Sequence, residues 1–71
     1  MDLAKYKVTA LIYPYAEYRL GSPALIIDEG SFYRIDGTHI FDKHKIKGIC
    51  PEAGRIRIEM TDKTVILEVV M

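Results

Sequence analysis

The side chains that could support catalysis or metal binding are few in this chain and lie far apart. Its 71 residues include two histidines and one cysteine, and His39, His44 and Cys50 do not have the spacing of metal ligands. His39 could act as a general base, but its expected cross-strand neighbour is Arg34, and no second polar residue is expected to orient it. The sequence contains neither a glycine-rich phosphate loop nor a nucleophile elbow. We therefore predict no metal, no cofactor and no enzymatic activity.

The remaining reactive groups have local explanations. Asp28, Asp36 and Asp62 stand at expected turns, where aspartate bonds to the neighbouring backbone. Cys50 could be a reactive thiol, but only Lys47 lies close enough along the chain to favour the thiolate. An inert thiol is the expected state of Cys50.

A basic segment offers one binding hypothesis. Lys43, His44, Lys45 and Lys47 stand close together in the sequence. They could face the phosphates of a single nucleic-acid strand while aromatic rings stack on its bases. The rings expected nearby are Phe32, Tyr33 and Phe41. The chain has ten basic and ten acidic residues and no net charge, which is unusual for nucleic-acid-binding domains, so a small nucleic-acid-binding β-barrel is kept as the alternative function.

Apolar and aromatic side chains outside the expected core offer a second binding hypothesis. Some point away from the core faces of the expected strands, and others cluster with Tyr18 around Pro14. The candidate interface residues are Tyr13, Tyr15, Phe32, Phe41, Ile66, Val70 and Met71. Either a curled sheet covers both of its faces, or one patch is an interface, because monomers rarely expose large contiguous apolar patches. An apolar last strand also invites strand addition across a dimer, so we predict a homo-oligomer or a protein partner.

The strands that must position these residues are indicated by a hydrophobic pattern that repeats every two residues. Apolar and polar residues alternate over short runs that turn signals interrupt, which predicts an all-β domain over residues 1–71 with six to seven short antiparallel strands and little or no helix. The expected strands cover residues 5–13, 15–20, 24–28, 32–35, 38–41, 55–60 and 64–70. Residues 21–23 are expected to form a turn, residues 42–48 a bulge or one irregular turn, and residues 50–54 a loop. The strands would form a curled sheet or a small barrel.

The alternation also predicts which side chains share a face. The first strand places Tyr6, Val8, Ala10 and Ile12 together, and the run Leu25-Ile26-Ile27 suggests burial on both sides.

The dipeptide Asp36-Gly37 predicts a two-residue hairpin turn. In that register Ile35 pairs with Thr38 and shares its face with Ile40, whereas Phe41 faces the other way.

The last two strands carry the clearest pattern. A turn at Asp62-Lys63 would pair Met60 with Val65 and place six aliphatic side chains on one dry face. These are Ile56, Ile58, Met60, Val65, Leu67 and Val69. On the opposite face Arg57 would meet Glu68, an opposite-charge pair. A shift of one residue in the strand pairing would move all six aliphatic side chains into water. We therefore expect this face to be strongly determined.

Size and composition limit how the chain can be stabilised and where it acts. A domain of this length buries only about 60% of the surface of its unfolded chain, and one cysteine permits no internal disulfide. Good packing or self-association is therefore expected to stabilise it. A lone thiol suits a reducing compartment, and no signal peptide or apolar run of about 20 residues is evident. We expect a cytoplasmic protein.

The order of elements over residues 25–70 resembles that of bacterial PH-like and GRAM-like domains. It runs from Leu25-Ile26-Ile27-Asp28 through the Asp36-Gly37 hairpin and the Ile46-x-x-Ile49 step to the two final strands. The resemblance implies a β-barrel that a C-terminal helix closes at one end. This chain stops at Met71 with no such helix, so the open end is expected to be covered in another way, for example by a second subunit. The family supplies no site residue that matches this sequence.

The sequence as a whole predicts a non-enzymatic binding or assembly module. It is expected to associate with itself through a sheet edge and an apolar face.

Overall fold

The computed structural model describes residues 3–70 and shows an all-β fold, as predicted. Seven strands form one antiparallel sheet in the order β4-β3-β2-β1-β7-β6-β5. The strands are β1 (Lys7–Ile12), β2 (Glu17–Asp28), β3 (Phe32–Ile35), β4 (His39–Asp42), β5 (Ile46–Glu52), β6 (Arg55–Met60) and β7 (Thr64–Val70), with one short 3₁₀ turn, η1 (Lys43–Lys45). None of the described residues forms a helix long and apolar enough to cross a membrane.

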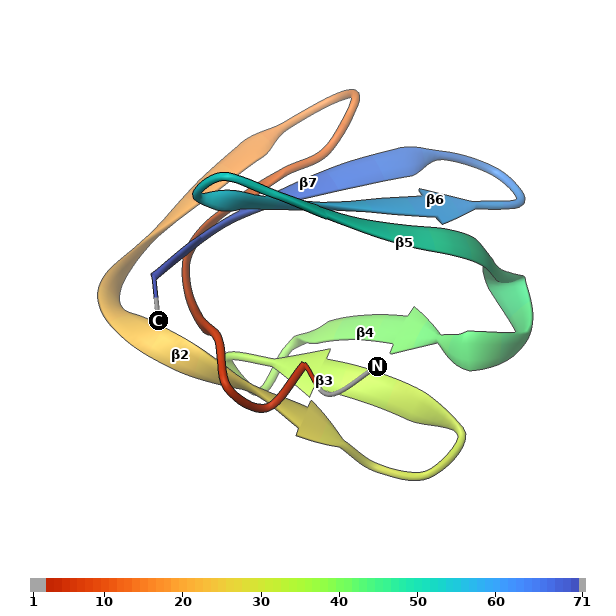
Figure 1. Cartoon of the computed structure of the whole chain (residues 1–71), viewed down its shortest axis with the longest axis horizontal. Coiled ribbons are helices and arrows are strands. Elements are labelled where there is room, and N and C mark those ends of the chain that lie inside the picture. The colour runs from red at the N-terminus through yellow and green to blue at the C-terminus, as the bar shows by residue number, and fades with distance from the viewer. Residues whose placement is uncertain (1–2, 71) are drawn as a thin grey trace.

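The sheet curls but does not close into a barrel. β5, β6 and β7 form one layer, and β3, β4 and the end of β2 form the other (Figure 1). The long β2 passes between the layers: it pairs with β1 as far as Leu25 and with β3 from Ile26. The two edge strands, β4 and β5, follow one another in the chain, and η1 joins them.

The core lies between the two layers and is aliphatic apart from Phe41. The buried hydrophobic residues among those described are Leu3, Val8, Ala10, Leu11, Ile26, Ile35, Phe41, Ile56, Ile58, Met60, Val65, Leu67 and Val69. No charged or polar residue of the described chain is buried with them. Hydrophobic burial and close packing are therefore what hold the two layers together.

A bulge in β1 changes the predicted face of its second half. Val8 lies opposite Val69 and Ala10 lies opposite Glu68, so β1 holds one residue more than β7 at this point. The extra residue resets the alternation. Leu11 is fully buried and Ile12 only partly so; the prediction that Ile12 continues the core face was wrong.

The expected turn at residues 21–23 was also wrong. The strand β2 continues through Gly21, Ser22 and Pro23. Between the pairs Val8–Ala24 and Ala10–Arg19, β2 has more residues than β1, and the extra residues form a bulge. Glycine and proline weaken a strand interior without necessarily ending it, and both are tolerated at a bulge. The interruption lets one strand bend from the first layer into the second.

The apolar run that follows the bend is buried on one side only. Ile26 points into the core, whereas Leu25 and Ile27 are about half exposed. The prediction of burial on both sides was wrong because no second layer covers the outer face of β2 among the described residues.

The β3–β4 hairpin has a loop one residue longer than predicted. Asp36 and Gly37 adopt positive φ angles of 54° and 73°, but Thr38 joins them in the loop and Ile35 pairs with His39. A shift of one residue moves a whole strand to the other face. Phe41 is therefore fully buried and Ile40 is half exposed, the reverse of the prediction.

The last hairpin confirms the predicted dry face. Its six aliphatic residues are all buried on one side of β6 and β7. The turn is wider than predicted, and Ile58 pairs with Val65 rather than Leu67. A shift of two residues keeps every side chain on its own face, so the faces were right although the register was wrong.

The predicted pairing of Arg57 with Glu68 was wrong for the same reason. Arg57 lies opposite Ile66 and forms ion pairs with Glu52 and Glu59 on its own side of the sheet. Glu68 pairs with Arg19 of β2 instead, at 3.2 Å.

The irregular segment before β5 is confirmed as one turn and a bulge. The Asp42 carboxylate accepts a hydrogen bond of 2.9 Å from the backbone N–H of His44 at the start of η1, and the β5–β6 register shifts between Ile46 and Gly48. The predicted loop at residues 50–54 is shorter than expected, because Cys50–Glu52 belong to β5. Pro51 is tolerated there because β5 is an edge strand.

Candidate functional site

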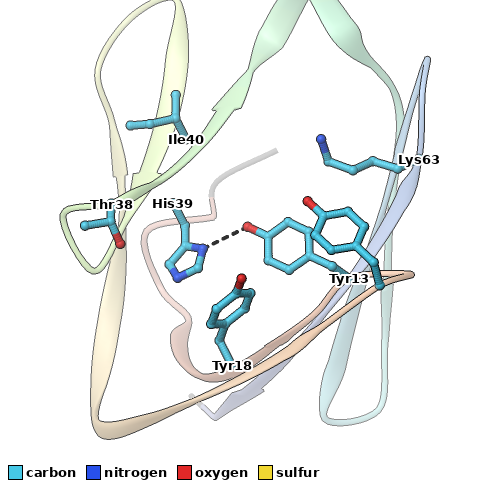
Figure 2. A pocket seen from close by; sticks show the side chains of 7 residues that line it. Tyr13, Tyr18, Thr38, His39, Ile40 and Lys63 are labelled. Carbon is cyan, nitrogen blue, oxygen red and sulfur yellow. Dashed lines mark hydrogen bonds between the residues drawn. The ribbon is translucent and has the colours of Figure 1, made fainter.

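Three turns meet around an open pocket of about 550 Å³. They are the β1–β2 turn, the β3–β4 loop and the β6–β7 turn. The lining residues are Tyr13, Tyr15, Tyr18, Thr38, His39, Ile40 and Lys63. In Figure 2, Lys63 lies across the pocket from Thr38 and His39, and Tyr13 and Tyr18 lie beside His39.

The β1–β2 turn brings the three tyrosines together. The backbone N–H of Tyr13 donates to the carbonyl of Ala16 at 2.7 Å and closes a turn around Pro14 and Tyr15. Proline favours the second position of such a turn because its φ angle is fixed. Leu11 pairs with Tyr18 across β1 and β2, and this register places Tyr18 close to Tyr13.

The Tyr13 ring is the centre of the aromatic cluster. It stacks on Phe41 below at a centroid distance of 6.2 Å and on Tyr15 at 5.6 Å. Tyr18 meets it edge-on at 5.5 Å, and His39 stacks beside it at 5.8 Å. Aromatic pairs in such geometries add about 0.5–1.5 kcal/mol beyond the area they bury, so the cluster holds Tyr13 in place.

Tyr13 also orients His39. Its hydroxyl lies 2.8 Å from His39 Nδ1. Burial, with smaller contributions from Tyr15 and Tyr18, raises the pKa of Tyr13 to about 12, so the hydroxyl keeps its proton at neutral pH. The direction of this hydrogen bond follows the His39 tautomer: the hydroxyl donates to Nδ1 when the ring proton is on Nε2, and it accepts from Nδ1–H in the other tautomer.

The prediction that no polar residue orients His39 was therefore wrong. Its cross-strand neighbour is Ile35, not Arg34. Tyr13 reaches it from 26 positions earlier in the chain. Nothing local in the sequence signals that contact, because it depends on how two separate turns meet.

The electrostatic character of the pocket is close to neutral. Lys63 is its cationic lining residue and lies 3.7 Å from the carboxylate of Asp62. Asp36 stands in the loop that carries Thr38. No carboxylate is among the lining residues, and the described residues contain no group of three His, Cys, Asp or Glu that could hold a metal ion.

The structure scatters the other predicted interface residues. Tyr13 and Tyr15 line the pocket, but Phe41 is fully buried beneath Tyr13 and cannot belong to an exposed surface. Phe32 is partly buried under Arg34, whose guanidinium lies 5.7 Å from its ring centroid. Ile66 is partly buried and Val70 about half exposed on β7. Met71 lies outside the described residues.

The predicted nucleic-acid patch is less suited to binding a nucleic-acid strand than the sequence suggests. Lys43 donates to the Asp28 carboxylate at 2.8 Å; this hydrogen bond raises the pKa of Lys43 and lowers that of Asp28. The same ammonium lies 4.8 Å from the ring centroid of Tyr33 and covers it. His44, Lys45 and Lys47 are exposed. Since Phe41 is buried, the expected platform of rings beside these lysines is not formed.

Cys50 has a neighbour that the sequence did not suggest. Arg57 lies directly opposite it across β5 and β6, and a hydrogen bond with Cys50 is the main reason that the pKa of Arg57 is raised. Cys50 is partly buried. The pair lies on the strand edge, away from the aromatic pocket.

Sequence reasoning missed part of the pocket. Thr38, Ile40 and Lys63 were not among the candidate residues, and His39 was considered only as a base. A weak signal was present: each of these residues stands in or next to a predicted hairpin turn. The turns could be predicted, but their convergence could not.

The fold and the pocket define a small, curled antiparallel β domain with an open aromatic pocket between three of its turns. Comparison with protein-family models, curated proteins and solved structures found no match to this chain. The resemblance to PH-like and GRAM-like domains stays a prediction.

Proposed function

We propose that this chain is a non-enzymatic binding module and that the aromatic pocket is its ligand site. The observation that carries the proposal is the exposure of two tyrosines at the pocket rim, 73% for Tyr15 and 44% for Tyr18. Neither ring serves the core, and exposed aromatic side chains that converge on a concavity are typical of binding sites.

The base of the pocket is organised before any ligand arrives. Tyr13 stacks on Phe41 and on Tyr15 and is hydrogen-bonded to His39. A ligand site whose rings are already fixed loses less conformational entropy on binding. The rigid base supports a role in recognition.

The role of the histidine also favours binding over catalysis. Its Nδ1 is hydrogen-bonded to the hydroxyl of Tyr13, which is a poor base and does not ionise near neutral pH. A catalytic histidine is usually oriented by a carboxylate that stabilises its charged form. In this pocket His39 acts as a fixed structural partner for Tyr13.

The proposal can be tested by nuclear magnetic resonance on the ¹⁵N-labelled full chain. We expect ligand probes of several classes to include one that shifts the backbone amides of Tyr15, Thr38, His39 and Lys63 as a group. Tyr15→Ala should abolish that response, and Phe32→Ala, which truncates a ring on the outer face of β3, should retain it. Shifts confined to other parts of the sheet, or equal losses in both variants, would contradict the proposal.

A second candidate function, self-association, is favoured by an apolar outer face. Leu25, Ile27, Ile40 and Val70 are each between 48% and 54% exposed. The register aligns Ile27 and Ile40 on either side of Arg34, and Leu25 and Val70 on either side of Lys7. Aliphatic side chains in cross-strand rows of this kind could pack against a second copy of the sheet.

Sedimentation velocity distinguishes this second candidate. Self-association through the outer face predicts a dimer that Ile27→Lys converts to a monomer, while Tyr15→Ala leaves it intact. A wild-type chain that stays monomeric at high concentration would remove the candidate.

A further inference from the structure

The rim of the aromatic pocket offers hydrogen-bond donors and no group that can only accept. Tyr15, Tyr18 and Thr38 carry hydroxyls, and Lys63 carries an ammonium that can only donate. His39 Nδ1 is already hydrogen-bonded to Tyr13. The lining contains no carboxylate or carboxamide. A ligand that presents hydrogen-bond acceptors is therefore complementary to this rim, because Lys63 can only donate and each hydroxyl can donate.

The same rim offers ring faces set at a steep angle. Tyr15 lies within 26° of the plane of Tyr13, whereas Tyr18 stands at 89° to that plane. Both rings contact Tyr13, Tyr15 by stacking and Tyr18 edge-on, so the rim presents aromatic surfaces in two orientations. Aromatic surfaces in two orientations suit several compact apolar rings better than a single large flat group.

The charge of the site selects against strongly charged ligands. Lys63 opposes a cationic ligand such as a quaternary ammonium. It is also a weak site for a phosphate chain, because Asp62 lies 3.7 Å away and Asp36 stands in the adjacent loop. Nucleic-acid strands need several unpaired cations along their path. A neutral ligand with apolar rings and carbonyl acceptors fits these conditions best.

Proline-rich peptides have this chemistry. Proline has no backbone N–H, and a left-handed polyproline II helix leaves all of its carbonyls free to accept hydrogen bonds. The helix is also pre-extended, so little entropy is lost when it docks on an aromatic surface. On the premise of the proposed function, we propose that the aromatic pocket binds a proline-rich peptide in the polyproline II conformation, with proline rings against the exposed rings of Tyr15 and Tyr18 and peptide carbonyls on the tyrosine hydroxyls and Lys63.

The test compares two mirror-image peptides on the ¹⁵N-labelled full chain. The probe is an oligo-L-proline of about ten residues, roughly three turns of the helix, and the control is the all-D peptide with the same composition and acceptors. A single-stranded oligouridine RNA of similar length is titrated in parallel. We expect the L-peptide alone to shift the amides of the pocket turns.

Variants then assign the contacts. Tyr15→Ala should weaken binding of the L-peptide about tenfold or more, and Tyr18→Phe, which removes one hydroxyl, about two- to tenfold. Phe32→Ala should change it less than about twofold. Retained amide dispersion in each variant shows that the fold is intact.

The outcomes separate this inference from the proposed function. Equal responses to the L- and D-peptides, or pocket shifts with RNA but not with oligo-L-proline, would overturn the polyproline assignment while the pocket remains a binding site. If no probe of any class moved the pocket amides, both proposals would fail together.

Discussion

The last hairpin and the aromatic pocket are built from the same kind of strands but depend on different information. β6 and β7 bury six aliphatic side chains on one face, and period-two alternation alone determines that face. The pocket depends on three turns and on contacts as distant in sequence as that of Tyr13 with His39. Core faces are thus a local property of this chain, whereas its candidate site is a property of the assembled fold.

The largest stability effect should come from the hairpin core. Leu67→Ala removes a fully buried side chain and should lower the free energy of unfolding by about 2–5 kcal/mol. Val70→Ala truncates a half-exposed side chain on the same strand and is the matched control. Urea denaturation followed by circular dichroism measures both. Similar losses for the two variants would contradict the assignment of the β7 faces.

A smaller effect is expected at the β3–β4 loop. Gly37 has a φ of 73°, with no atom near the position of an added Cβ, so Gly37→Ala should cost about 1–2 kcal/mol through backbone strain alone. Gly21→Ala meets no neighbour and requires no positive φ. Thermal unfolding of both variants compares them. A neutral Gly37→Ala would mean that the loop does not have the conformation described.

Removal of the Tyr13 hydroxyl should have a similar or smaller effect that depends on pH. Tyr13→Phe is expected to cost about 0.5–1.5 kcal/mol near neutral pH through loss of one hydrogen bond. The pKa of Tyr13 is raised from 10.0 to about 12 in the folded chain. Its stabilising contribution is therefore complete below about pH 10 and is lost as the pH rises toward about 12.

The difference in unfolding free energy between wild type and Tyr13→Phe measures this contribution and cancels the titration of the other groups. Ultraviolet titration of the phenols provides an independent check, since one tyrosine should ionise later than the rest. A difference that stays constant up to pH 12 would contradict the burial of the Tyr13 hydroxyl.

Replacement of Tyr15 should cause the smallest change in the free energy of unfolding but a large loss of ligand binding. Tyr15 is mostly exposed, and Tyr15→Ala should lower the free energy of unfolding by only about 0.5 kcal/mol, the low end of the range for an aromatic pair. The same variant should lose most of the ligand response of the pocket. A loss of stability comparable to that of Leu67→Ala would show that Tyr15 belongs to the core rather than to a binding surface.

The contrast between the last hairpin and the pocket also determines which features could be predicted from the sequence. The all-β class, the bounds of β3, β6 and β7, and the dry face of the last hairpin could be read from alternation. The face of Phe41 could not, because one extra loop residue, Thr38, reverses a strand. The bowed segment of β2 was missed because glycine and proline mark both a turn and an irregular strand. The bulge in β1 was missed because Val8-Thr9-Ala10 contains no residue that marks an irregular strand.

The candidate site was predictable only in part. Tyr13 and Tyr15 were recognised as a cluster, but Lys63 and Thr38 enter the pocket from turns far away in the sequence. Tertiary contacts between turns leave no periodic signal in the chain. The basic segment was visible in the sequence, yet the structure ties Lys43 to Asp28 and buries one of its expected rings.

The most direct test of the account is the measurement of intermolecular nuclear Overhauser effects between the labelled chain and oligo-L-proline. The account predicts contacts from the proline ring protons to the aromatic protons of Tyr15 and Tyr18. Contacts that instead place the peptide on the outer face, at Ile27 or Leu25, would contradict it.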